Sequence, residues 1–226
     1  MATKKIDKQA LQKEKIEETV SKTEQFYNEN KKTIWGCILA AVVIALGVLA
    51  YNQFYLKPRV AEAQEQAYPA EAAFRNGNFE QALNGDGNNY GFAQVIDEYG
   101  TKAGKAMYLY AGICELELQD YDAAISYLKK YNGKDAILAA RAQACLGDAY
   151  VGLQDYKTAV TYYDKAVAVS DNVFAAGYLL KAGIASEEMG DKEKALSYYE
   201  TIKDKYPQSV EAYDIDKYIN RIKFSE

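Results

Sequence analysis

Residues 117–125 read ELQDYDAAI and residues 152–160 read GLQDYKTAV, so one short pattern recurs 35 positions apart. Two further segments, residues 75–83 (RNGNFEQAL) and residues 188–196 (EMGDKEKAL), keep its turn and its alanine. The recurring alanines are 42, 35 and 36 residues apart: Ala82, Ala124, Ala159 and Ala195. A period of this length is the signature of a helical repeat array, in which each helical hairpin buries its apolar face on the next.

A glycine precedes each of the last three alanines. It follows a second small residue in the pairs Ala111-Gly112 and Ala182-Gly183, and a leucine in the pair Leu146-Gly147. A residue without bulk is needed where two antiparallel helices meet closely, so we expect such a contact at each pair. Larger side chains follow four positions after these alanines: Leu128, Tyr163 and Tyr199.

Together these elements resemble the tetratricopeptide repeat over roughly residues 66–207, with Pro207 at the place of the family's terminating proline. The family's early Trp is missing, and Tyr108, Gln143 and Leu179 lie near its place. The resemblance implies an all-α fold in which a tetratricopeptide-type α-solenoid of about four helical hairpins follows one N-terminal transmembrane helix.

The solenoid needs a cap at its last repeat, because an array exposes an apolar face at its end. Residues 209–224 predict a C-terminal capping helix, since Ile215, Tyr218, Ile219 and Ile222 recur at helical spacing on one face. The Asn- and Gly-rich residues 84–91 interrupt the first repeat and predict a loop that joins two parts of a helix. They lack the context of a phosphate-binding or calcium-binding loop.

A membrane segment is predicted near the N-terminus. Residues 33–56 contain no charged residue. A helix over this uncharged stretch would be long enough to cross the hydrocarbon layer. The chain then divides into a cytoplasmic tail (1–32), a transmembrane helix (33–56) and an exported repeat domain (57–226). Lys31 and Lys32 precede the span directly, so the positive-inside rule places the N-terminus in the cytoplasm. The expected location is the cell inner membrane, with the repeat domain in the periplasm.

Two alternatives to a membrane span fit the sequence less well. A cleaved signal peptide needs a short charged start and an apolar core of 7–15 residues, whereas about 32 polar residues come first here and the apolar run is longer. A buried core helix is disfavoured by Trp35 at one end of the run, by Tyr51, Phe54 and Tyr55 at the other, and by the preceding lysine pair.

Composition excludes several function classes. The chain has no His, which removes the usual metal ligand and the usual general base. Cys37, Cys114 and Cys145 form no C-x-x-C pair, so we expect no metal, and the last two are expected as buried core residues. The part beyond residue 32 is acidic, which disfavours nucleic acid. No nucleophile motif is present, so we expect no enzyme and no cofactor.

The first helices of successive tetratricopeptide repeats line a concave face that binds protein partners. Projecting the family pattern onto this chain gives nine candidate groove residues: Leu109, Ile113, Leu116, Arg141, Asp148, Val151, Leu180, Ile184 and Glu187. Spacing alone does not separate a groove position from a core position, so several of the nine are equally expected inside the core. A groove as apolar as this one would suit an extended or helical apolar segment.

The arrangement of tail, span and exported repeat domain resembles the ancillary subunit of the bacterial Sec translocon. That resemblance implies contact with the Sec translocon and with exported client proteins, in a chaperone-like role. The alternatives are an envelope scaffold for cell division or outer-membrane assembly and, more weakly, a membrane-anchored enzyme.

Overall fold

The computed structural model describes residues 3–169 and 171–224, with side chains described from residue 24 onward except at residue 101. Helices joined by turns and short loops make up these ranges, and no strand occurs within them. The chain divides into two compact units, residues 1–58 and residues 59–226. The all-helical prediction is therefore confirmed.

The first unit is one long helix, α1 (Thr3–Tyr51), followed by a π-helical turn, η1 (Asn52–Leu56). The helical stretch Glu24–Arg75 contains an 18-residue window with a mean hydropathy of 2.5, and none of that window is buried. Its length and composition suit a membrane crossing. Several of its large apolar side chains are more than half exposed, among them Leu39, Ile44 and Leu49.

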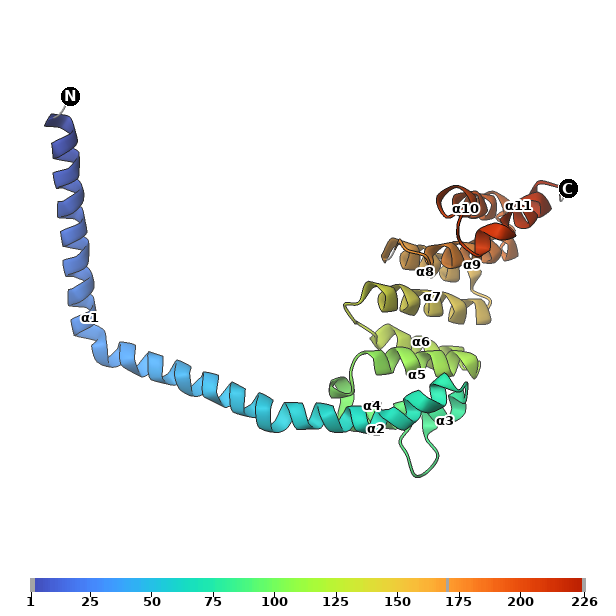
Figure 1. The fold of residues 1–226 in the computed structure, drawn as a ribbon, viewed down its shortest axis with the longest axis horizontal. Coiled ribbons are helices and arrows are strands. Elements are labelled where there is room, and N and C mark those ends of the chain that lie inside the picture. Colours follow the sequence, from blue (N-terminus) through green and yellow to red (C-terminus); the bar gives the residue numbers. More distant parts are fainter. Residues whose placement is uncertain (1–2, 170, 225–226) are drawn as a thin grey trace. The chain divides into compact units, whose positions relative to one another are not determined.

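The second unit stacks helical hairpins in chain order (Figure 1). The first hairpin pairs α2 (Lys57–Arg75) with the split helix α3 (Phe79–Asn84) and α4 (Phe92–Tyr99). After the 3-10 turn η2 (Gly100–Ala103) the next hairpins are α5 (Ala106–Glu117) with α6 (Tyr121–Lys130), α7 (Ala136–Gly152) with α8 (Tyr156–Val169), and α9 (Ala175–Glu188) with α10 (Lys192–Lys205). The 3-10 turn η3 (Glu211–Tyr213) and α11 (Ile215–Lys223) complete the unit.

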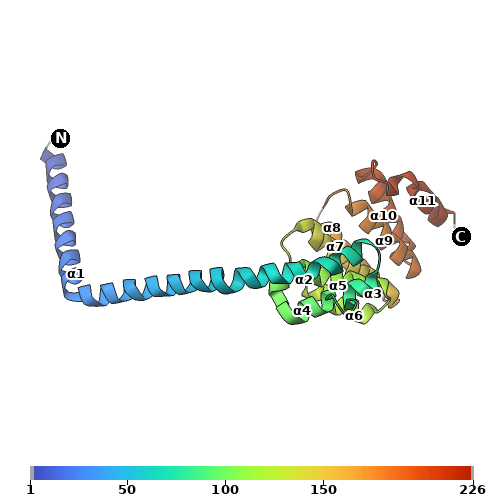
Figure 2. The same cartoon turned by 60° about the horizontal axis from the view of Figure 1, so that its bottom comes forward.

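Residues 85–91 form the predicted loop between α3 and α4 (Figure 2). The Asp86 carboxylate accepts hydrogen bonds from the backbone N–H groups of Asn88 and Asn89, at 3.0 and 2.8 Å. Hydrogen bonds from the Asn89 side chain, and then these backbone bonds, lower the pKa of Asp86. A Cβ atom on Gly91 would lie 2.2 Å from the carbonyl oxygen of Leu83, so only glycine fits there. The loop is built to close tightly on itself.

The recurring small residues lie where the helices of each hairpin touch. The alanines Ala82, Ala124, Ala159 and Ala195 are all fully buried. A Cβ atom on Gly147 would approach Cε1 of Tyr163 to 2.5 Å, and one on Gly183 would approach Cε1 of Tyr199 to 2.3 Å. The glycine of each pair and the large residue 16 positions later, noticed separately in the sequence, are therefore packing partners. Gly112 and Leu128 form the same contact in the second hairpin.

Side-chain bonds spaced by one repeat join the third hairpin, the fourth hairpin and the cap. Lys181 Nζ of α9 donates to Asp148 of α7 at 2.7 Å. The hydroxyl of Tyr198 of α10 donates to Asp164 of α8 at 2.7 Å. Arg221 of α11 donates to Glu187 of α9 at 2.6 Å. These partners are 33 or 34 positions apart in the chain, so each bond links equivalent helices of neighbouring repeats.

The capping helix forms as predicted. Ile215 and Ile219 of α11 are buried against Ile202 and Tyr199 of α10 in one apolar cluster. Two ion pairs fix the helix to α10: Lys203 with Asp216 at 2.6 Å, and Lys223 with Glu200 at 3.0 Å. Both pairs are well exposed, so the apolar contacts contribute most of the stabilisation.

Candidate partner-binding surface

The nine predicted groove residues fall into three groups by exposure. Leu109 is fully buried and Ile113 is 6% exposed, and both belong to the core that α5, α6 and α7 share. Their side chains therefore pack inside the repeat array and are not available to a partner. Half-buried side chains form the second group: Leu116, Asp148, Val151, Leu180 and Glu187. Only Arg141 and Ile184 are exposed.

Asp148 organises the surface between α7 and α9. Its Oδ1 atom accepts hydrogen bonds from the hydroxyl of Tyr163 and from Lys181 Nζ, both at 2.7 Å. Burial is the first cause of the raised pKa of Tyr163, and the negative charge of Asp148 adds to it. The lysine is 47% exposed, so it still presents its charge to solvent.

Glu187 has the same role one repeat later. Its Oε1 atom accepts hydrogen bonds from the hydroxyl of Tyr199 at 2.5 Å and from Arg221 at 2.6 Å. Tyr199 is fully buried, and burial is again the first cause of its raised pKa, ahead of the bond to Glu187. Asp148 and Glu187, two of the predicted polar groove residues, thus each bind the tyrosine hydroxyl of their own hairpin. Each also binds a cation from the equivalent helix one repeat further on.

Two residues of this face were missed by sequence reasoning, Tyr178 and Lys181 of α9. Burial raises the pKa of Tyr178, while the positive charge of Arg141 on α7 acts in the opposite direction. The surface of α7 and α9 therefore combines Arg141, Tyr178, Lys181 and Ile184. It offers two cations, one aromatic ring and one exposed aliphatic side chain to a partner.

A small aromatic cavity of about 160 Å³ lies between α2, α4 and α5. Its walls include the rings of Phe74, Phe92 and Tyr110, whose centroids are 5.2–6.1 Å apart. Glu71 and Arg75 complete its lining, with 3.9 Å between their charged atoms. No motif in the sequence predicts this cavity, because its rings come from two hairpins.

Comparisons with known proteins agree with this geometry. One family model described as tetratricopeptide repeat matches residues 106–134 and 178–209, and a second model of the same description matches residues 140–172. No curated protein matches the chain.

Two crystal structures of the protein MamA are similar in fold. One superposes with a TM-score of 0.55 at 22% identity and covers 73% of this chain and 82% of that chain. The other has a TM-score of 0.51 at 22% identity and covers 68% of this chain and 91% of that chain. At this level of identity the likeness shows the fold alone. Repeats of this type are protein–protein interaction modules.

Proposed function

Because this chain carries tetratricopeptide repeats, we propose that it is a membrane-anchored module that binds other proteins and catalyses no reaction. The observation that carries the proposal is the surface of α7 and α9, where Arg141, Lys181 and Ile184 are all exposed. Charged and apolar groups side by side on rigid helices are what recognition of a peptide segment requires. We name this surface, with the neighbouring Tyr178, the α7–α9 face.

The anchor follows from the apolar part of α1. Its exposed Leu39, Ile44 and Leu49 have no protein side chain to cover them within the described residues. Leaving such side chains in water costs about 1.5–3 kcal/mol each, whereas lipid tails would cover them all. We therefore propose that residues 33–56 span the inner membrane, with residues 1–32 in the cytoplasm and residues 57–226 in the periplasm.

For the partner, we propose the Sec translocon and the proteins that it exports. A tether at the membrane holds the repeat unit near the place where exported chains emerge unfolded. Tethering raises the effective concentration of a weak binder, so modest affinity is sufficient for a partner that must also be released. The acidic repeat unit and its α7–α9 face would hold a client briefly in a chaperone-like manner.

Alkaline phosphatase fused after Glu226 should be active, because the Lys31 and Lys32 pair keeps the N-terminus inside. The measurement is phosphatase activity in whole cells, with fusion protein quantified by immunoblot. A fusion after residue 32 serves as control and should be inactive. A stable but inactive fusion at Glu226 would contradict the proposed orientation.

A photocrosslinking amino acid at Ile184 should give protein adducts in cells, because this side chain is 39% exposed on the α7–α9 face. The same probe at Ile113 should give none to other proteins, because that position is 6% exposed in the core. Mass spectrometry of the adducts identifies the partner.

The identity of the adducts decides between the proposals. Translocon subunits or newly exported proteins in the Ile184 adducts would support the proposed partner. Cell-division or outer-membrane assembly proteins would replace it by the scaffold alternative. If position 184 yields no adduct while probes elsewhere on the repeat unit do, the α7–α9 face is not the binding surface.

A further inference from the structure

The turns that join the two helices of each hairpin carry a second regular surface. In the last three hairpins, one apolar side chain stands at the end of the first helix: Leu118, Leu153 and Met189. These side chains are 39%, 42% and 38% exposed. They lie 35 and 36 residues apart, so each hairpin contributes one at the same place. We call these three residues the turn edge.

Contacts between neighbouring repeats bring the members of the turn edge together. A Cβ atom on Gly152, at the end of α7, would lie 2.3 Å from the ring of Tyr121 at the start of α6, so the second and third turns touch. Tyr156, at the start of α8, packs in one cluster with Ala185 near the end of α9, which joins the third and fourth turns. The apolar side chains therefore form a row across three hairpins.

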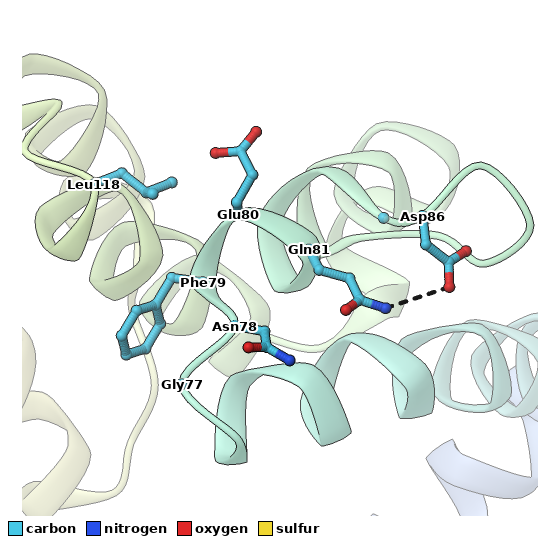
Figure 3. A pocket seen from close by; sticks show the side chains of 8 residues that line it. Gly77, Asn78, Phe79, Glu80, Gln81, Asp86 and Leu118 are labelled. Atoms are coloured by element: carbon cyan, nitrogen blue, oxygen red, sulfur yellow. Dashed lines mark hydrogen bonds between the residues drawn. The ribbon is translucent and has the colours of Figure 1, made fainter.

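An open pocket of about 700 Å³ continues this row at its N-terminal end (Figure 3). Leu118 lines it on one side, and Gly77 to Gln81, Gly85 and Asp86 line it on the others. Figure 3 shows Glu80 between Leu118 and the hydrogen-bonded pair of Gln81 and Asp86, which are 3.3 Å apart. The pocket thus has an apolar wall and an acidic rim.

Carboxylates accompany the apolar row along its length. Glu80, Glu117 and Glu188 are exposed, and none forms an ion pair within the described ranges 24–100, 102–169 and 171–224. Each turn also has an aspartate that accepts a backbone hydrogen bond at the start of the second helix: Asp120, Asp155 and Asp191. Arg75, Lys157, Lys192 and Lys194 are the basic residues of the same turns, and the acidic residues there outnumber them, so negative charge is in excess.

The electrostatics of a neighbouring group agree with this excess. The pKa of Glu115 is raised, first by burial and then by the negative charges of Asp120 and Glu80. A cationic partner would relieve this repulsion. An apolar row flanked by unpaired carboxylates is complementary to a segment in which leucine-like side chains alternate with lysine or arginine.

We propose that the turn edge is a second protein-binding surface, which takes a cationic amphipathic segment of a partner protein. Apolar side chains of the segment pack on Leu118, Leu153 and Met189, and its cations face Glu80, Glu117 and Glu188. The surface lies at the hairpin turns, whereas the α7–α9 face lies along the helices α7 and α9 themselves.

The test uses the full chain in an uncharged detergent. The probe is a fluorescein-labelled peptide of about 14 residues, made of leucine and lysine. The leucines are placed at helical spacing so that they share one face and the lysines share the other. Fluorescence anisotropy measures its affinity for the unaltered chain and for a variant with Leu118→Ser, Leu153→Ser and Met189→Ser. We expect affinity to fall about tenfold or more, because all three apolar contacts are lost. The peptide also partitions into detergent micelles, but it does so equally with every variant, so the comparison between variants is unaffected.

Two further variants make the result specific. Replacing Glu80, Glu117 and Glu188 by glutamine should weaken binding and flatten its dependence on salt. The matched control, Val173→Ser with Val210→Ser, removes two apolar side chains that are 71% and 81% exposed elsewhere, and it should leave affinity unchanged. Circular dichroism checks that each variant stays folded.

An equal loss of affinity in the control, or affinity within about twofold of the unaltered chain for the turn-edge variant, overturns the proposal. A peptide with glutamate in place of lysine should not bind, and equal binding of that peptide would also overturn it. The affinity of this peptide tests the turn edge, and the crosslinked adducts at Ile184 test the α7–α9 face. Failure of one proposal can therefore be distinguished from failure of the other.

Discussion

Replacing Gly147 with alanine should lower the free energy of unfolding of the repeat unit by about 1–3 kcal/mol. The new Cβ atom would meet the ring of Tyr163 at 2.5 Å. That ring is 2% exposed, and Asp148 fixes its hydroxyl, so it cannot move aside without loss of other contacts. The overpacking acts against the intrinsic preference of helices for alanine, which favours the variant by about 1 kcal/mol.

Gly177 provides the matched control, because it also lies inside a helix, α9. A Cβ atom there meets only the side chain of Glu211, at 3.1 Å from its carboxylate oxygen. That flexible carboxylate can shift, so Gly177→Ala should stabilise the unit by up to about 1 kcal/mol. Urea denaturation followed by circular dichroism measures both variants. Equal effects of the two substitutions would show that the contact between Gly147 and Tyr163 is not tight.

Alkaline pH should unfold the repeat unit between about pH 9 and pH 12. Burial is the first cause that raises the pKa of Cys114 from 9.0 to about 12 and that of Cys145 from 9.0 to about 11. The pKa of Tyr206 rises from 10.0 to about 12, through burial and its hydrogen bond to Asp171. Burial also raises the pKa of Tyr163 and that of Tyr199.

The loss of stability at high pH follows from the difference in pKa between the folded and unfolded states. Each of these groups is neutral in the folded unit and ionises more easily in the unfolded chain, so its contribution to stability is complete below pH 9. That contribution is lost as the pH rises through the folded pKa. One pKa unit corresponds to about 1.4 kcal/mol, so the two thiols alone remove several kcal/mol. Urea titrations at intervals between pH 8 and pH 11 measure the loss. A constant free energy of unfolding across this range would contradict the burial of these groups.

The sequence predicts the repeat architecture well because one physical requirement recurs in each hairpin. Two helices that cross closely need a small residue at the contact, so Gly147 and Tyr163 both stand out in the sequence, as do Gly183 and Tyr199. The capping helix is equally visible, because Ile215 and Ile219 recur at helical spacing over a short segment. The boundaries of the split helix are less visible, because they depend on the tight closure between Gly91 and the Leu83 carbonyl.

The binding surface is harder to predict, because both sides of the first helix of a repeat are covered. One side packs on the second helix of its own hairpin and the other on the next hairpin. Projection of the family pattern therefore could not separate groove from core positions, and Leu109 and Ile113 lie in the core. The roles of Lys181 and Tyr178 depend on partners one repeat away. A single sequence does not contain the register between repeats that brings Lys181 onto Asp148.

The bonds that join neighbouring repeats also determine how the array comes apart. In a linear array the terminal unit has one neighbour and is normally the first to open. Here Asp148 is bonded to Lys181, Asp164 to Tyr198 and Glu187 to Arg221, so loss of the cap removes bonds of the hairpin before it. These bonds couple α7, α8 and α9 each to a helix one repeat further on, so we expect opening at the C-terminal end to involve more than one helix at a time.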